Sequence, residues 1–200
     1  AKKILKTKKI TTKLIKSKEY DSFYKSYLIN KKSKIPFISA KIAISKDFFT
    51  INKKKKWITN SFSRKIAHLF RSKHDGIIST SKSINHDNSL LNCRIKGLSE
   101  NKPDLFIIDL NLKLKKSLLL NRLLNKRKTY IITYKHNINK LKNYKKKGYK
   151  IILINSLNNK KDFLILFKNF YKIGYSRILT EAGLTFINAL IKHKLINDLY

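Results

Sequence analysis

The sequence predicts an α/β protein with a mostly parallel central sheet that helices cover on both faces. Apolar runs of strand length alternate with amphipathic segments of helix length, an order typical of this class. Most of the apolar runs are continuous stretches of Ile and Leu, as buried parallel strands usually are. The chain has only 5 Gly and 2 Pro, so no long flexible linker is expected within residues 36–200.

Six apolar runs are the expected strands. They span residues 37–45, 76–79, 105–108, 130–133, 150–154 and 177–180. Four amphipathic segments are the expected helices. They span residues 61–73, 139–147, 161–173 and 184–192. The first helix has an apolar stripe made of Phe62, Ile66, Leu69 and Phe70. Asn60 or Ser61 can cap its start.

The chain divides into a short leading segment and one domain. Residues 1–30 are more polar and rich in Lys, whereas residues 31–200 carry the alternating pattern. Two hundred residues with 42% apolar content can bury one core. The longest apolar run, residues 163–167, is far below the roughly 18 residues that span a bilayer. We therefore expect no membrane segment.

Composition alone allows a nucleic-acid partner. Lys and Arg number 47 against 11 acidic residues, a net charge of +36, which favours polyanions such as ribosomal RNA. Only six of these cations are Arg, however, and Lys, Ile and Asn are abundant everywhere, as an AT-biased coding sequence would produce. The single Cys93 excludes a disulfide framework and any multi-thiolate zinc site within the chain. It is compatible with a reducing cytosol, so we expect a cytoplasmic protein.

One candidate site follows the last expected strand. After residues 177–180 the chain turns through Gly183 into a helix whose first turn contains Thr185. Such a helix start offers backbone N–H groups to a diphosphate, although a plain helix entry is the more common explanation of such a turn. Glu181 lies at the carboxyl end of the strand, where α/β folds bind ligands, or it is only a charge near the helix start.

A second candidate site lies in residues 83–94, which we expect to form a loop. Asp87 could anchor a sugar hydroxyl, and Arg94 could bind a phosphate with its fork of donors. Each is alternatively a surface ion pair, and Arg71 is alternatively a cation that favours the end of its helix. Trp57 is alternatively a core residue. The five histidines show no metal-binding spacing, so none is given a role.

Several segments together resemble the reductase half of the bacterial bifunctional riboflavin-biosynthesis deaminase/reductase. The similar pieces are K-I-A-I-S-K-D at 41–47, W-I-T at 57–59, Arg71, D-G-I-I at 75–78, S-I-N-H-D-N-S-L-L-N-C-R at 83–94, L-F-I-I-D at 105–109, I-L-T-E-A-G-L-T at 178–185 and L-I-N-D-L at 195–199. The leading segment resembles the tail of the family's deaminase domain. The deaminase zinc signature, H-x-E with P-C-x-x-C, is not in this chain, so no metal site is expected.

The resemblance implies a fold like dihydrofolate reductase, with three α/β/α layers, usually as a homodimer. It implies reduction of the ribosyl group of 5-amino-6-(5-phosphoribosylamino)uracil to a ribityl chain, with NADPH as cofactor. The implied cofactor-binding residues are Trp57, Ser83, Asp87, Gly183, Leu184, Thr185 and Ala189. The implied substrate-binding residues are Arg71, Leu91, Arg94 and Glu181. The polar groups implied in turnover are Lys41, Asp87 and Glu181.

The chain also departs from the family's pattern. Phe48 stands where the family has Gly, and Lys55 where a Ser is usual. Asn88 and Ser89 replace Asp and Pro after the second expected strand, and the family continues beyond L-I-N-D-L. These differences raise an alternative, a drifted domain or one truncated at its carboxyl end. The competing class is a basic RNA-binding, ribosome-associated protein, in which basic and aromatic residues would gather on one face.

Overall fold

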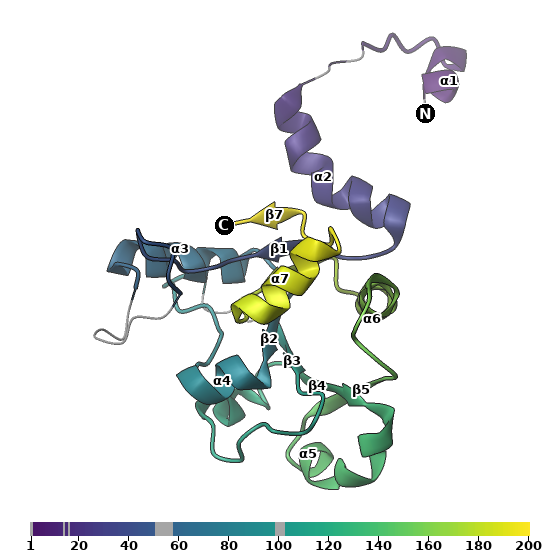
Figure 1. The fold of residues 1–200 in the computed structure, drawn as a ribbon. Helices are drawn as coiled ribbons and strands as arrows, with labels where there is room; N and C mark the ends of the chain where they lie inside the picture. Colours follow the sequence, from purple (N-terminus) through teal and green to yellow (C-terminus); the bar gives the residue numbers. More distant parts are fainter. Residues whose placement is uncertain (1, 14, 16, 51–57, 99–102) are drawn as a thin grey trace.

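The computed structural model describes residues 2–13, 15, 17–50, 58–98 and 103–200 (Figure 1). These residues contain a seven-stranded sheet in the order β5-β4-β3-β2-β6-β1-β7, and its six neighbouring pairs are all parallel. The strands are β1 (Phe37–Ala40), β2 (Gly76–Thr80), β3 (Asp104–Ile108), β4 (Thr129–Tyr134), β5 (Lys150–Ile154), β6 (Arg177–Thr180) and β7 (Asp198–Leu199). The prediction of a mostly parallel sheet is confirmed.

Helices connect these strands. They are α1 (Lys2–Thr7), α2 (Lys18–Ser33), α3 (Ser61–Ser72), α4 (Ser81–Asp87), α5 (Lys142–Lys146), α6 (Lys160–Lys172), α7 (Leu184–Lys192) and the 3₁₀ helices η1 (Leu119–Leu123) and η2 (Lys135–Lys140). Helices α3, α6 and α7 match the expected helices to within one residue at each end.

Two hydrophobic cores, one on each face of the sheet, make the protein three-layered. One core lies between the sheet and helices α6 and α7, where Ile78, Phe167 and Leu190 are fully buried. The other lies on the opposite face against α3, α4 and η1, where Ile77 and Ile84 are fully buried. Successive residues of a strand point to opposite faces, so one apolar run serves both cores. This explains why the strands are continuous Ile and Leu runs.

The first strand is shorter than expected. It ends at Ala40, whereas the apolar pattern suggested that it would continue to residue 45. Its neighbours β6 and β7 also end here, and the last backbone bonds are Lys41 N–H to Thr180 O at 3.0 Å and Ile42 N–H to Tyr200 O at 2.9 Å. A strand needs a neighbour for its backbone groups, so the chain leaves the sheet at this point.

We expected residues 83–94 to form a loop, but only part of this segment is one. Their first part belongs to α4, which starts where the Thr80 side chain accepts a hydrogen bond from Ser83 N–H. It ends at Asn88, whose left-handed backbone closes the helix with its N–H bonded to Ile84 O. The Thr80 side chain at one end and the Asn88 backbone at the other therefore cap a segment whose Ser, Asn and Asp residues have low helix propensity.

The expected helix 139–147 is also different. It is replaced by η2 followed by α5, so only residues 142–146 are α-helical. Buried Asn137 holds η2 against the sheet, because its side-chain amide donates to Leu110 O at 2.8 Å and to Thr133 Oγ1 at 2.9 Å. These bonds favour the tighter 3₁₀ turn before the α-helix begins.

The leading segment contains α1 and most of α2, which continues to Ser33. Ser17 caps α2, and the helix packs on the domain through Asn30, whose amide donates to Ser176 O at 3.1 Å. Lys25 forms a salt bridge of 2.6 Å with Asp198 of β7. No helix among the described residues has the length and apolar character needed to cross a bilayer.

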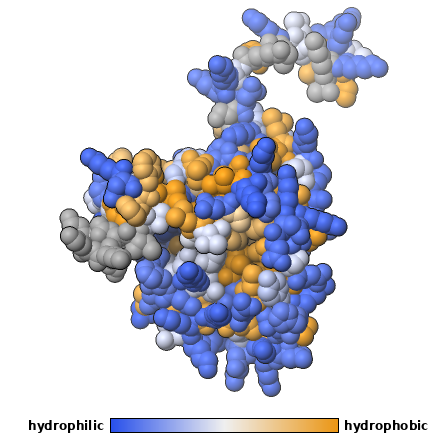
Figure 2. Space-filling model, viewed as in Figure 1, coloured by the Kyte–Doolittle hydropathy of each residue, from blue (hydrophilic) through white to orange (hydrophobic). Residues whose placement is uncertain are grey.

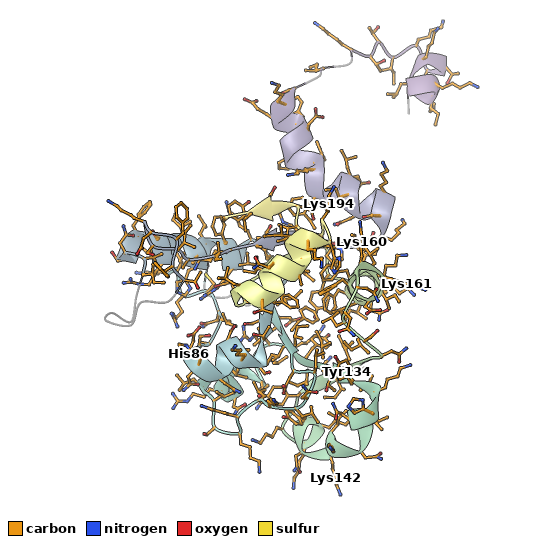
Figure 3. The ribbon with its side chains drawn as sticks, viewed as in Figure 1. His86, Tyr134, Lys142, Lys160, Lys161 and Lys194 are labelled. Atoms are coloured by element: carbon orange, nitrogen blue, oxygen red, sulfur yellow. The ribbon has the colours of Figure 1, made fainter. Side chains whose placement is uncertain are left out.

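The basic residues do not gather in one stripe on the face that Figure 2 shows, where hydrophilic residues surround smaller apolar areas. Figure 3 shows Lys160 and Lys161 on α6 near Lys194, which follows α7, whereas Lys142 on α5 lies at the opposite end of the domain.

Candidate active site

The candidate site lies where the direction of the chain connections changes. Strand β6 leads into α7 on one face, whereas its neighbours β1 and β2 lead into α3 and α4 on the other. In open parallel sheets, ligands bind in the crevice that this reversal opens outside the carboxyl ends of the strands. The residues that follow β1, β2 and β6 therefore lie where such a crevice is expected.

A buried ion pair forms the floor of the site. Arg71, in the last turn of α3, donates from Nε to Glu181 Oε1 at 2.6 Å and from Nη2 to Oε2 at 2.8 Å. Their side chains are only 13% and 10% exposed. Burial by itself would lower the pKa of Arg71, but the hydrogen bonds and charge of Glu181 outweigh it and raise that pKa. Glu181 is in turn fixed by its backbone N–H, which donates to Ile78 O at 2.9 Å.

A second arginine lies on the same side of α3. Arg71 Nη1 also donates to Asn92 O at 3.2 Å, and that carbonyl lies 2.9 Å from His68 Nδ1. His68 Nε2 lies 3.2 Å from Nη2 of the exposed Arg94. The Asn92 carbonyl and the His68 ring thus connect the buried ion pair to the guanidinium of Arg94 at the surface.

A buried arginine fixes the loop that carries Arg94. Arg127 is 6% exposed, and it donates from Nη1 to Leu91 O at 2.6 Å and from Nη2 to Leu90 O at 2.5 Å. Burial lowers the pKa of Arg127 to about 10, which leaves it protonated at neutral pH. Leu91 has a positive φ of 47°, a strained backbone for a branched residue, and its carbonyl is held by this bond.

Two helix starts flank the crevice. Ser83 in the first turn of α4 accepts from Gly183 N–H at 3.1 Å and contacts Thr80 Oγ1 at 3.0 Å. Gly183 begins α7 without a side-chain cap, and Leu184 and Thr185 after it are exposed. The exposed first turn of α7 can therefore offer backbone donors and the positive end of its dipole to an anion.

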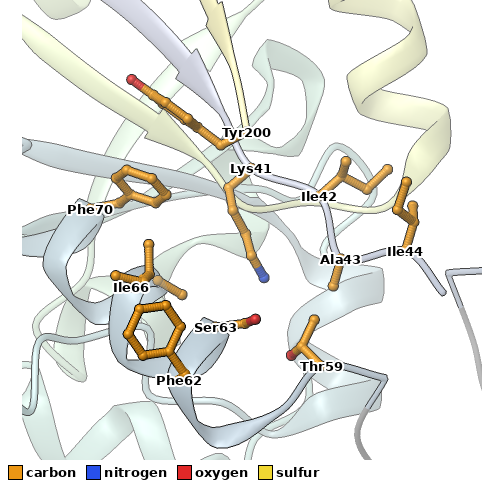
Figure 4. A pocket seen from close by; sticks show the side chains of 11 residues that line it. Lys41, Ile42, Ala43, Ile44, Thr59, Phe62, Ser63, Ile66, Phe70 and Tyr200 are labelled. Atoms are coloured by element: carbon orange, nitrogen blue, oxygen red, sulfur yellow. The ribbon is translucent and has the colours of Figure 1, made fainter. Parts of the chain in front are cut away.

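Lys41 lines a pocket next to this crevice. Ala40 pairs with Thr180 in the register of β1 and β6, so Lys41 and Glu181 follow at the ends of adjacent strands. The pocket has a volume of about 260 Å³, and Figure 4 shows the Lys41 ammonium pointing into it toward Ser63. The other lining residues are Ile42, Ala43, Ile44, Thr59, Phe62, Ile66, Ala67, Phe70 and Tyr200. An apolar wall with one ammonium suits a planar ring that bears polar groups.

The structure joins some of the expected site residues by direct contacts, but not all of them. Arg71, Glu181 and Arg94 belong to one hydrogen-bonded network, and Ser83 contacts Gly183. Leu91 has a buried side chain, so only its backbone is available, and Ala189 is half-buried on α7.

Asp87 is separate from that network. Its side chain is 60% exposed and pairs with His86 Nδ1 at 2.7 Å on the outer part of α4 (Figure 3). Trp57 and Lys55 lie outside the described residues. Phe48 has a φ of 63°, the left-handed conformation that glycine favours, so a ring occupies a position suited to glycine.

Sequence reasoning missed three residues of the network. His68, Asn92 and Arg127 connect or support the arginines, yet the sequence offered only one hint of them. His68 and Arg71 are three residues apart in a helix, so they share a face. The role of Asn92 is a backbone carbonyl, and Arg127 is distant in sequence, so no local pattern indicates either.

Known proteins resemble this chain in sequence and in fold. The family model described as RibD C-terminal domain matches residues 36–200. The riboflavin biosynthesis protein RibD of Buchnera aphidicola subsp. Baizongia pistaciae is 30% identical over 198 residues, which cover 92% of this chain and 52% of that protein. The chain thus spans about half the length of this curated relative.

Two solved structures show the same fold. RibD of Acinetobacter baumannii aligns with a TM-score of 0.79 at 20% identity, covering 98% of this chain and 54% of that chain. The Saccharomyces cerevisiae riboflavin biosynthesis reductase Rib7 aligns with a TM-score of 0.65 at 21% identity, covering 91% and 80%.

Proposed function

The chain belongs to the family of RibD C-terminal domains, and on that premise we propose that it is a reductase of riboflavin biosynthesis. Its proposed substrate is 5-amino-6-(5-phosphoribosylamino)uracil, whose ribosyl group is reduced to a ribityl chain with NADPH. The observation that carries this proposal is the network in which Arg71 and Glu181 lie beside the exposed Arg94 at the carboxyl edge of the sheet. That arrangement offers hydroxyl-binding groups and a phosphate-binding fork within one crevice.

The reaction requires proton transfers that side chains can guide. The C1–O4 bond of the ribose breaks as O4 takes up a proton and the amino nitrogen gives one up, which leaves an imine between C1 and that nitrogen. NADPH, when bound, supplies the hydride that reduces C1, and the nitrogen takes up the remaining proton. Lys41 would stabilise negative charge that develops on the sugar oxygen, and Glu181 would hold a hydroxyl or move a proton there.

The residues around α7 fit the diphosphate of a dinucleotide. The first turn of this helix is exposed and lacks a side-chain cap, and the Gly183 N–H before it donates to Ser83 Oγ at 3.1 Å. An anion at such a position is stabilised by backbone N–H groups and the helix dipole. We propose that Ser83, Gly183, Leu184, Thr185 and Ala189 hold the cofactor, and that Trp57 and Asp87 contribute as the family resemblance implies.

Turnover and binding test this proposal together. The purified protein should oxidise NADPH only when the phosphoribosylaminouracil is present, and Lys41→Ala, Glu181→Gln and Arg94→Ala should each reduce kcat/KM strongly. Lys172→Ala, at the far end of α6, is a matched surface control.

Thermal shifts with NADPH, NADH and a short RNA distinguish an enzyme from an RNA-binding protein. Stabilisation by RNA alone would replace this proposal with the RNA-binding alternative. Sedimentation velocity tests the proposed homodimer.

A further inference from the structure

His68 has contacts that fix the role of each ring nitrogen. Nδ1 lies 2.9 Å from Asn92 O, and a carbonyl only accepts, so Nδ1 carries the proton. Nε2 lies 3.2 Å from Arg94 Nη2, and a guanidinium only donates, so Nε2 is the acceptor. The imidazole in this arrangement is therefore neutral.

The two arginines of the network differ in how their charge is balanced. Arg71 is matched by the carboxylate of Glu181 through two hydrogen bonds. Arg94 has no carboxylate within salt-bridge distance among the residues that the structure describes, and its partner there is the neutral His68. Arg94 is thus held in one orientation without losing its positive charge.

We propose that His68 is a positioning residue that holds the Arg94 guanidinium ready for the phosphate of the substrate. This inference rests on the proposed function and deepens it, because it states how the enzyme recognises a phosphorylated sugar. A carboxylate in place of His68 would neutralise Arg94 and compete with the phosphate. An imidazole lone pair orients the guanidinium by a single bond and leaves its other N–H groups free for phosphate oxygens.

The surroundings of His68 keep it neutral. Burial and the nearby charges of Arg71 and Arg94 lower the pKa of His68, while the Asn92 carbonyl and Glu181 act in the opposite direction. These are the charged and titratable groups that face the ring from α3, from the loop carrying Arg94 and from the end of β6. Protonation at acidic pH would remove the acceptor for Arg94 and add a like charge beside it.

Two substitutions separate the two bonds of His68. Gln places an amide oxygen near the position of Nε2 and can still accept from Arg94, whereas Asn reaches only the position of Nδ1. We expect His68→Asn to raise KM for the phosphorylated substrate by about tenfold, because the hydrogen bond that orients the charged Arg94 is lost. The value of kcat should stay within about twofold of the wild type. His68→Gln should keep KM within about threefold of the wild type. In an Arg94→Ala background, His68→Asn should have no further effect on KM.

The pH dependence of KM gives a second readout. As the pH falls and His68 becomes protonated, KM of the wild type should rise more steeply than KM of His68→Gln. The titration of the substrate phosphate is common to both proteins and cancels in the ratio. Equal profiles for the two proteins would overturn the inference, as would equal KM values for His68→Asn and His68→Gln.

Binding of ribose 5-phosphate, measured by calorimetry against ribose, distinguishes this inference from the proposed function. If the wild type does not reduce the pyrimidine yet binds ribose 5-phosphate more tightly than His68→Asn does, the proposed function fails and the role of His68 stands. The role of His68 is wrong if the wild type reduces the pyrimidine substrate but binds ribose 5-phosphate no more tightly than ribose. It is also wrong if the wild type binds ribose 5-phosphate no more tightly than His68→Asn does.

Discussion

Arg71 and Glu181 lie 110 positions apart in the sequence and form a two-pronged ion pair at the carboxyl edge of the sheet. Both side chains are almost buried, so their removal from water opposes folding, and only good geometry offsets that penalty. Such a pair adds little net stability compared with apolar side chains of equal size. Its position at the carboxyl edge of the sheet fits the proposed function, in which it supplies two fixed polar groups.

The first prediction follows from that balance. Glu181→Gln leaves the Arg71 charge buried without its counter-ion, and we expect the free energy of unfolding to fall by about 3 kcal/mol. The double variant Arg71→Met with Glu181→Met should recover most of this loss, because both charges are then gone. Urea unfolding measures the stability, and NADPH oxidation with the pyrimidine substrate should stay abolished in the double variant.

The exposed Glu19→Gln in the first turn of α2 is the matched control, with an expected change below about 0.5 kcal/mol. A double variant that is stable and also active would show that the ion pair is only structural. A Glu181→Gln protein as stable as the wild type would contradict the energetic argument.

The architecture could be predicted from the sequence because it depends on local patterns. Continuous Ile and Leu runs such as residues 105–108 are strands in the structure, and the amphipathic residues 161–173 are a helix. The end of β1 could not be predicted, because the apolar character continues through Ile42 and Ile44 while the neighbouring strands stop. Where a strand ends is a property of its neighbours as well as of its own residues.

The candidate site was predicted only in part, for a similar reason. Arg71 and Glu181 follow regular elements, and the family resemblance indicated both. The links between Arg71 and Arg94 run through a backbone carbonyl and a loop that the buried Arg127 shapes. Long-range contacts of that kind leave no periodic signal in the sequence, so His68 was given no role.

The second prediction concerns Arg127 as the support of that loop. Arg127→Met removes the N–H groups that donate to the carbonyls of Leu90 and Leu91. These two carbonyls then lose that hydrogen-bond donor in a region that is largely shielded from water. We expect a loss of about 2 kcal/mol in the free energy of unfolding, together with a higher KM because Arg94 is no longer held. The control is Arg122→Met, the same change at an exposed position of η1, which should leave both quantities nearly unchanged. Equal effects of the two variants would rule out this role.

The third prediction tests the packing around Phe106. A Cβ at Gly76 would lie 2.7 Å from Phe106 Cε2. The Phe106 ring cannot move aside, because it is fully buried against Tyr130 and Phe170 at centroid distances of 4.8 and 4.2 Å. Gly76→Ala should therefore lower the free energy of unfolding by about 2 kcal/mol.

Gly183→Ala is the comparison for this change, because the nearest atom to its added Cβ is Ser83 Oγ at 3.6 Å. Its effect on stability should stay below about 1 kcal/mol. If thermal and urea unfolding gave the two alanine variants the same stability, the overlap at Phe106 would not be the cause.

The last prediction uses a buried histidine to set the acid limit of the fold. His74 Nδ1 lies 2.6 Å from Phe70 O and its Nε2 lies 3.0 Å from the buried Ser39 hydroxyl, so the ring donates to the carbonyl and accepts from the hydroxyl. Burial lowers the pKa of His74 below its value in the unfolded chain. The unfolded state therefore binds a proton first as the pH falls, and stability present above about pH 6.5 is lost as the pH falls through the folded-state pKa of His74.

We expect urea unfolding at about pH 7.5 and about pH 5.5 to show a smaller drop in stability for His74→Gln than for the wild type. His68 acts in the same direction, so the comparison is best made in a His68→Gln background. A His74→Gln protein with the full acid sensitivity of its parent would mean that the buried imidazole is not the group that titrates.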